Sequence, residues 1–137
     1  MGRIVAIDYG TRRTGLAVSD PLRLIAGALD TVPTAALVGY LKEYVSRNGV
    51  DVMVVGKPMQ MSGAPSQSYA AAEALVATLK REFPGVEVAW WDERFTSRMA
   101  QRTMLESGIG RQRRRDKALV DRISATIILQ GYMDSKK

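Results

Sequence analysis

The chain has 137 residues, a net charge of +6, 46% hydrophobic and 25% charged residues, and neither cysteine nor histidine. This composition is typical of a soluble globular protein, and the length fits a single domain over residues 1–137. The missing residue types exclude disulfides, thiolate metal sites and catalytic triads built on histidine or cysteine. Any metal site must use oxygen ligands, which suit Mg²⁺ or Mn²⁺.

The first half of the chain predicts three strands and a helix. A continuous apolar run predicts a buried strand over residues 3–9. A tight turn over residues 10–13 leads to a second strand over residues 15–19, and such a short turn can join only antiparallel neighbours. A third strand is expected over residues 24–29. Thr34 is the expected N-cap of the following helix, which ends near Asn48.

The second half of the chain predicts alternating strands and helices. Residues 51–55 form a short buried strand, and residues 56–66 form a loop rich in glycine, proline and serine. The remaining expected elements are a helix starting at Ser66 or Ser68, a strand over residues 86–91, a helix over residues 96–108, a mobile basic loop and a last helix beginning near Asp116. This order predicts a three-layer α/β fold with a mixed sheet.

No apolar run is long enough to cross a membrane. The first residues run directly into a predicted strand, which leaves no room for a signal peptide. We therefore expect a cytoplasmic protein that does not associate with membranes.

Three carboxylates occupy positions where an acid needs an explanation. Asp8 interrupts the first apolar run, Glu93 directly follows a strand ending in two tryptophans, and Asp121 lies on the rim of the apolar stripe of the last helix. The carboxyl ends of parallel strands meet at one edge of a sheet, so we expect these acids to converge there. Converging carboxylates repel one another unless divalent cations lie between them. The pattern therefore predicts a two-metal site that hydrolyses phosphodiesters.

Each acid also has an ordinary structural interpretation. Asp8 could be a turn residue, Glu93 could pair with Arg94 or Arg98, and Asp121 could be a solvated helix residue. Only their joint occurrence favours the metal site. Asp116 is interpreted as a cap of the last helix, not as a metal ligand.

The excess of positive charge is concentrated in one segment. Residues 94–117 contain eight basic and two acidic residues, so they account for the whole net charge of +6. A localised basic segment is typical of a surface that binds nucleic-acid phosphates. The candidate nucleic-acid-binding residues are Arg12, Arg13, Lys57, Arg94, Arg98, Arg111, Arg113, Arg114, Arg115 and Lys117.

Four sequence blocks together resemble a known family. The blocks are AIDYGTRRTGLAVSD at residues 6–20, VVGKPMQMSG at 54–63, WDERFTS at 91–97 and DRISATIILQGYM at 121–133. The chain resembles the YqgF (RuvX) family, proposed pre-16S rRNA nucleases related to Holliday junction resolvases. The resemblance implies a ribonuclease H-like fold, with a five-stranded mixed sheet flanked by helices. It also implies Mg²⁺ or Mn²⁺ bound by the catalytic acids Asp8, Glu93 and Asp121.

The expected activity is a metal-dependent endonuclease that matures the 5′ end of pre-16S rRNA, as a monomer or a homodimer. A resolvase acting on four-way DNA junctions is the rival substrate class. Two other classes stay open: a nucleic-acid-binding module without catalysis, and an actin-like ATPase or sugar kinase. Actin-like ATPases and sugar kinases need two related lobes that close on a nucleotide, whereas a chain of 137 residues is long enough for only one.

Overall fold

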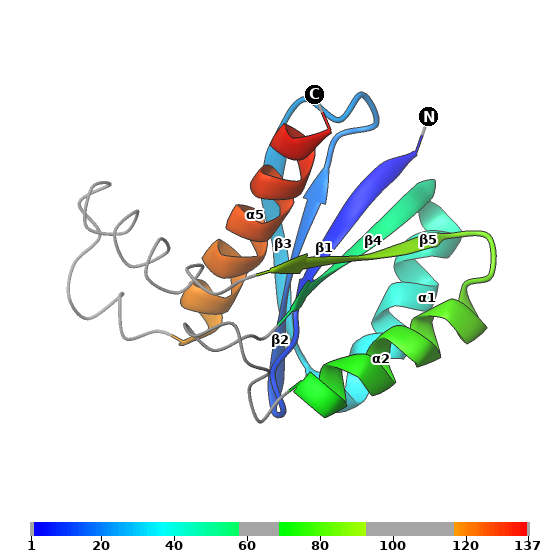
Figure 1. The fold of residues 1–137 in the computed structure, drawn as a ribbon, viewed down its shortest axis with the longest axis vertical. Coiled ribbons are helices and arrows are strands. Elements are labelled where there is room, and N and C mark those ends of the chain that lie inside the picture. The colour runs from blue at the N-terminus through cyan, green and yellow to red at the C-terminus, as the bar shows by residue number, and fades with distance from the viewer. Residues whose placement is uncertain (1, 58–68, 93–116, 137) are drawn as a thin grey trace.

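The computed structural model describes residues 2–57, 69–92 and 117–136 (Figure 1). This part of the chain contains a five-stranded sheet with the strand order β3-β2-β1-β4-β5. β1 pairs antiparallel with β2 and parallel with β4, β2 pairs antiparallel with β3, and β4 pairs parallel with β5. The mixed sheet expected from the sequence is confirmed. The strands are β1 (Arg3–Asp8), β2 (Arg13–Ser19), β3 (Ala26–Pro33), β4 (Val50–Lys57) and β5 (Glu87–Asp92).

Helices cover both faces of the sheet (Figure 1). The 3-10 turn η1 (Thr34–Ala36) leads into α1 (Leu37–Arg47), which lies with α2 (Tyr69–Glu82) on one face. Helix α5 (Lys117–Ser135) lies on the other face, mainly against β2, β3 and β1. The three-layer α/β architecture is therefore as expected. Within the described ranges, no helix is long and apolar enough to cross a bilayer.

Strand β1 is buried on both faces because its residues alternate between two hydrophobic clusters. Val5 and Ile7 belong to the cluster shared with α1 and α2, while Ile4 and Ala6 belong to the cluster shared with α5. Successive side chains of a strand point to opposite faces. The alternation therefore assigns even-numbered residues of β1, including Asp8, to the α5 face.

The third strand begins later than the sequence predicts, so the expected range of 24–29 is wrong. Pairing with β2 starts at Ala26, opposite Ser19, and continues to Pro33. Leu24 and Ile25 precede the strand, and the Asp20 carboxylate accepts hydrogen bonds from their backbone N–H groups at 2.7 and 2.8 Å. These bonds hold both residues in the β2–β3 loop despite their apolar side chains.

Thr34 does not cap α1, contrary to the expectation. The N-cap of α1 is Ala36, which makes no capping hydrogen bond through its side chain. The Thr34 hydroxyl donates to the Gly10 carbonyl oxygen at 2.6 Å, and it lies 2.9 Å from the Thr14 hydroxyl oxygen. Its backbone N–H donates to the Arg12 carbonyl oxygen at 2.9 Å. Thr34 thus fastens the β1–β2 turn to the start of α1.

The Asp20 interactions predict a pH-dependent contribution to stability. Hydrogen bonds from the backbone N–H groups, that of Ile25 foremost, lower the pKa of Asp20 below its usual value of 3.8. A lowered pKa stabilises the fold above the unfolded-state value, and this contribution disappears as the pH falls through the folded-state value. We expect Asp20→Ala to lower the urea midpoint at neutral pH. The difference from wild type should shrink below pH 3.8, and a pH-independent difference would contradict this account.

Candidate functional site

Asp8 ends β1 on the face that α5 covers. It is partly buried, and its partner across the antiparallel pair with β2 is Gly15. Ile4 and Ala6, which precede it on the same face, pack against α5. The Asp8 side chain is therefore the next in a row of side chains that lies beneath α5.

Gly15 is the contact point between the sheet and the first part of α5. A Cβ atom on Gly15 would overlap the carbonyl oxygen of Asp121 and would lie 3.0 Å from the Asp121 Cβ. Only glycine allows the helix backbone to come this close to the strand. Since Gly15 is also the partner of Asp8 in the sheet, Asp8 and Asp121 lie beside the same residue.

Gly56 flanks Asp8 on the other side. The parallel pairing of Ile7 with Val55 places Gly56 in the next position of β4, beside Asp8. Gly56 is buried, and its own partner on β5 is Trp91. Glycine has no side chain, so neither neighbouring strand covers the Asp8 carboxylate at this level of the sheet.

Asp121 forms an ion pair with Arg13, the first residue of β2. The Arg13 Nε lies 3.1 Å from the Asp121 Oδ2, and the two side chains are 43% and 24% exposed. Both residues are candidates from the sequence, one as a metal ligand and one as a phosphate contact. The ion pair places the positively charged Arg13 side chain at the same position as Asp8 and Asp121. Within the described ranges, no three acidic side chains lie close enough together to hold a metal ion.

The third acid and most of the basic candidates lie outside the described residues. These are Glu93, Arg94, Arg98, Arg111, Arg113, Arg114 and Arg115, as well as the predicted 96–108 helix, the basic loop and Asp116. For Lys57, at the end of β4, and Lys117, at the start of α5, only the backbone is described. Arg12 is exposed in the β1–β2 turn.

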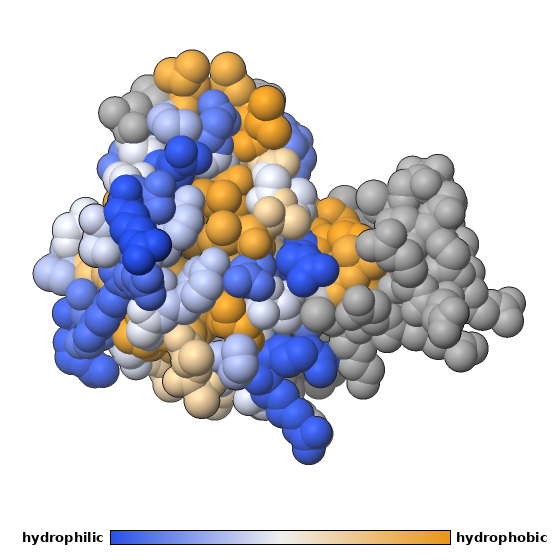
Figure 2. All heavy atoms as spheres, turned by 180° about the vertical axis from the view of Figure 1, so that it is seen from behind, coloured by the Kyte–Doolittle hydropathy of each residue, from blue (hydrophilic) through white to orange (hydrophobic). Residues whose placement is uncertain are grey.

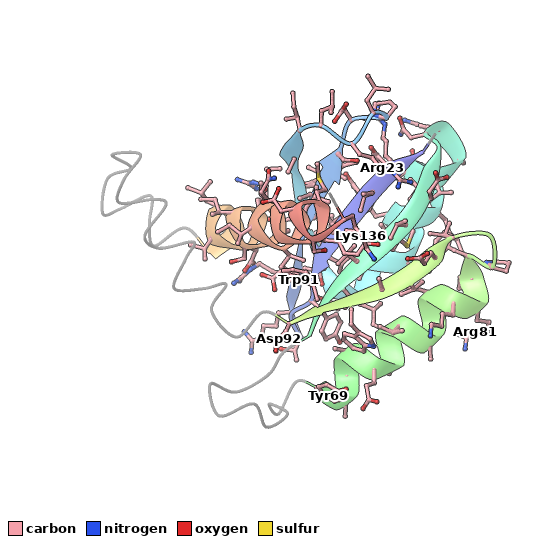
Figure 3. The ribbon with its side chains drawn as sticks, turned by 45° about the horizontal axis from the view of Figure 1, so that its top comes forward. Arg23, Tyr69, Arg81, Trp91, Asp92 and Lys136 are labelled. Atoms are coloured by element: carbon pink, nitrogen blue, oxygen red, sulfur yellow. The ribbon has the colours of Figure 1, made fainter. Side chains whose placement is uncertain are left out.

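Strand β5 ends at Asp92, which Figure 3 labels and which directly precedes Glu93 in the sequence. Its last residue, Asp92, pairs with Lys57, so β4 separates the end of β5 from the end of β1. Trp90 and Trp91 point to opposite faces of the sheet. Trp90 stacks on Tyr69 with a ring distance of 5.8 Å, and Trp91 packs on the α5 face. A Cβ atom on Gly131 of α5 would lie 2.7 Å from the Trp91 ring.

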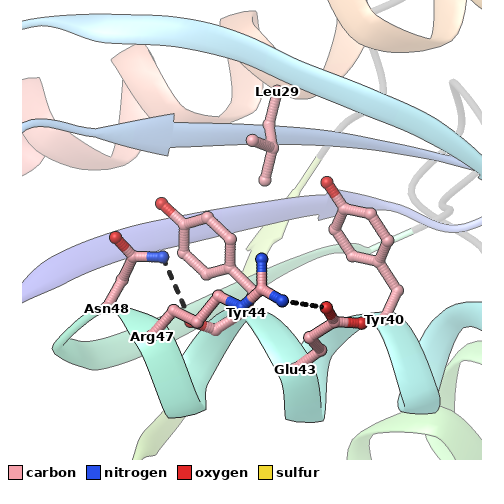
Figure 4. Close-up of a pocket in the computed structure, with 6 residues that line it drawn as sticks. All are labelled: Leu29, Tyr40, Glu43, Tyr44, Arg47 and Asn48. Atoms are coloured by element: carbon pink, nitrogen blue, oxygen red, sulfur yellow. Dashed lines mark hydrogen bonds and ion pairs between the residues drawn. The ribbon is translucent and has the colours of Figure 1, made fainter.

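A separate cavity of about 340 Å³ lies between α1 and β3 (Figure 4). Its lining includes Leu29, Tyr40 and Tyr44, which pack with the hydrophobic cluster of the α1 and α2 face. Burial raises the pKa of Tyr40, and the nearby Asp30 carboxylate raises it further. This cavity lies on the opposite face of the sheet from Asp8, so it is not part of the acidic site.

A family model described as "RuvX: Holliday junction resolvase" matches residues 2–135. The chain belongs to the RuvX family. The ribonuclease H-like architecture expected for RuvX is consistent with the five-stranded mixed sheet and its flanking helices.

Curated relatives of this RuvX chain match over almost its whole length. A protein of Porphyromonas gingivalis is 55% identical over 98% of this chain and 98% of its own length. A protein of Parabacteroides distasonis is 52% identical over 100% of this chain and 98% of its own length. A protein of Flavobacterium johnsoniae is 46% identical over 100% of this chain and 99% of its own length. Each carries the name "Putative pre-16S rRNA nuclease".

Proposed function

We propose that this RuvX chain is a cytoplasmic, metal-dependent endonuclease that matures the 5′ end of pre-16S rRNA. Asp8, Glu93 and Asp121 are its proposed catalytic ligands. The observation that carries the proposal is the contact of Asp121 with Gly15, the sheet partner of Asp8. This contact brings together two acids that are far apart in the sequence, at the end of a central strand.

The residues at this point fit a hard divalent cation. Asp8 and Asp121 offer carboxylate oxygens, which are the ligands that Mg²⁺ and Mn²⁺ prefer. Gly15 and Gly56 leave the position above Asp8 without a covering side chain from either neighbouring strand. When bound, a pair of such cations would polarise the scissile phosphate and activate the attacking water.

The arrangement of the strands supports a separate proposed role for each acid. Asp8 lies on the central strand and is proposed as the ligand shared by both cations. β5 lies two strands away from β1, which corresponds to a backbone separation of about 10 Å between these strands, and Glu93 directly follows β5 in the sequence. Carboxylates reaching inward from both sides of such a gap can hold two ions about 4 Å apart. Asp121 supplies the third ligand, from the helix above.

The basic residues are proposed to hold the nucleic-acid backbone. Arg13 already lies at the acidic site, and Arg12 is exposed in the adjacent turn. Arg12 lies in the turn after the strand that carries Asp8, and Arg13 begins the next strand, so both can orient a phosphate near Asp8. The basic segment at residues 94–117 and Lys57 would extend this contact along the substrate.

Two substrate classes follow from the comparisons. The names of the curated relatives support pre-16S rRNA, whereas the description of the family model supports four-way DNA junctions. We favour the rRNA substrate because the relatives match the whole chain at up to 55% identity.

The decisive assay compares both substrates under the same conditions. The protein is incubated with pre-16S rRNA 5′ fragments and with four-way DNA junctions, each with Mg²⁺, with Mn²⁺ or with a chelator. We expect metal-dependent cleavage of the RNA that is lost in Glu93→Gln and Asp121→Asn. If only the four-way junction were cleaved, the substrate would be branched DNA and not pre-16S rRNA. If the protein bound RNA but cleaved neither substrate with either metal ion, it would be a nucleic-acid-binding module without catalytic activity.

Arg13 provides a separate test of the metal site. An exposed ion pair contributes at most about 1 kcal/mol, so Arg13→Gln should change the free energy of unfolding very little. Because a cation beside the site repels a bound metal ion, the variant should bind Mn²⁺ about three- to tenfold more tightly. Its RNA affinity should fall, since a phosphate contact is lost. Titrations followed by electron paramagnetic resonance and by RNA binding measure both changes. Unchanged Mn²⁺ affinity would argue against metal binding at Asp121.

A further inference from the structure

The β2–β3 loop presents the most exposed large hydrophobic side chains in the described part of the chain. Leu22, Leu24 and Ile25 are 67%, 68% and 69% exposed. Figure 2 shows hydrophobic atoms gathered at the upper end of the molecule, where Figure 1 places this loop. Three exposed aliphatic residues on one loop form a contiguous apolar surface, which is typical of an interaction site.

The loop is held in one conformation by polar contacts. The Asp20 carboxylate accepts hydrogen bonds from the N–H groups of Leu22, Leu24 and Ile25 at 2.7 to 3.2 Å. Arg23 has a left-handed backbone, with φ of 59°, which is unfavourable for a residue with a side chain. Its guanidinium is fixed by the Gly2 carbonyl oxygen at 3.1 Å and the Asp51 carboxylate at 3.0 Å. The apolar side chains are thus carried by a preorganised loop, which lowers the entropic cost of binding a partner.

A cavity of about 390 Å³ lies directly beside the loop. Its apolar lining comes from Ile4, Val52, Tyr132 and Met133, and its charged lining comes from Arg23, Glu87 and Lys136. Figure 3 labels Arg23 at the loop and Lys136 at the end of α5, both near the N-terminal ends of β1 and β4. A cavity of roughly 150 Å³ accommodates a benzene-sized group, so this one can accommodate two branched aliphatic side chains.

The apolar side chains of the loop are complementary to the apolar lining of the cavity, and both lie at the same end of the molecule. Arg23 is part of both, so a two-fold axis next to Arg23 would place the loop of each copy against the cavity of the other. Such an interface is closed, because each copy contributes the same surface. The charges of the cavity also suit this pairing, since Glu87 of one copy can approach Arg23 or Lys136 of the other.

We propose that this surface joins two copies of the chain into a homodimer, in which the loop that carries Leu22, Leu24 and Ile25 of each copy docks against the cavity of the other and inserts two of these side chains into it. The interface lies at the N-terminal ends of β1 and β4, whereas Asp8 lies at the C-terminal end of β1 (Figure 1). Both acidic sites therefore stay accessible in the dimer. This proposal is independent of the proposed nuclease activity.

Sedimentation velocity over a concentration series tests the proposal. The wild-type chain is expected to form a dimer, and Leu24→Asp to raise its dissociation constant by roughly 100-fold, because the substitution acts twice in a symmetric interface. Ala77→Asp, which adds the same charge on the exposed surface of α2, should leave the dimer intact. At concentrations where both chains are monomeric, thermal unfolding of Leu24→Asp should match wild type, since the side chain is exposed in a single copy. A wild-type chain that stays monomeric throughout, or a dimer that survives Leu24→Asp, overturns the proposal.

The absence of cysteine allows a direct test of the geometry. A single cysteine introduced as Leu22→Cys is joined to nearby amines by a short thiol–amine cross-linker, in a mixture of isotopically light and heavy chains. We expect a light–heavy cross-link between position 22 of one copy and Lys136 of the other. Cross-links within single chains only, or a dimer linked at other lysines, contradict the proposed docking. Binding of the loop to lipid vesicles by a monomeric chain would also overturn it.

Discussion

Gly15→Ala is expected to lower the free energy of unfolding by about 3 kcal/mol, because an added methyl group has no space in a packed contact. The new Cβ would overlap the carbonyl oxygen of Asp121. Both sides of this contact are backbone, so neither can move away by rotating a side chain. α5 would have to shift away from β2, and Asp121 would move away from Asp8.

The matched control for this prediction is Gly39→Ala. A Cβ atom on Gly39 would meet nothing within 4 Å, and the residue is exposed in α1. Replacing an exposed helical glycine with alanine should raise stability by about 0.5 to 1 kcal/mol. Urea unfolding followed by tryptophan fluorescence measures both variants. If Gly15→Ala were as stable as wild type, α5 could not lie on β2 in the way described.

Asp8→Asn is expected to reduce cleavage of the pre-rRNA substrate by about a thousandfold or more, because the proposed ligand of both cations loses its charge. Its folded state should be as stable as wild type, or more stable, because one of two neighbouring negative charges is removed. Mn²⁺ should raise the unfolding temperature of the wild-type chain through binding to the folded state, and this increase should be absent in Asp8→Asn.

Asp134→Asn serves as the control for Asp8→Asn. Asp134 is exposed near the end of α5, where it accepts a hydrogen bond from Gln130 at 2.9 Å. Activity and Mn²⁺-dependent stabilisation should match wild type in this variant. An Asp8→Asn protein that cleaves RNA as fast as wild type would remove Asp8 from the catalytic site.

The central elements of the fold could be predicted because their sequence patterns reflect simple geometry. The apolar run of β1 is buried on both faces, and the short turn after it required an antiparallel β2. In α2, helical periodicity predicts a stripe of Tyr69, Ala72, Leu75, Val76 and Leu79, and the structure buries all of these except Tyr69, which is partly exposed. Periodicity was sufficient in these elements because burial on one or two faces determines which residues can occupy them.

The errors arose where side-chain hydrogen bonds override the preference read from hydrophobicity or helix capping. Thr34 has the right chemistry for a helix cap, but its hydroxyl bonds to Gly10, which is 24 residues away and cannot be identified from the residues nearby in the sequence. The apolar residues Leu24 and Ile25 were expected in a strand, but their N–H groups donate to the Asp20 carboxylate. Asp20 lies only four and five residues before them, so an aspartate before a loop was the available local signal.

The candidate site was predictable in part. The sequence predicted that Asp8 and Asp121 converge at one edge of the sheet, and in the structure both lie beside Gly15. The sequence did not reveal that Gly15 itself makes this possible. A glycine inside a strand is the available signal, since it often marks a close approach of another backbone. The position of Glu93 stays a prediction.

The pairing of Arg13 with Asp121 has a consequence for protein synthesis. These residues are 108 positions apart in the sequence, so Arg13 is synthesised early in translation and Asp121 near its end. The hairpin of β1 and β2 can form as soon as it leaves the ribosome, but α5 emerges last. With Asp121 as a proposed catalytic ligand, a nascent or truncated chain would lack one of the acids, and cleavage of RNA would have to wait until α5 has been made and folded.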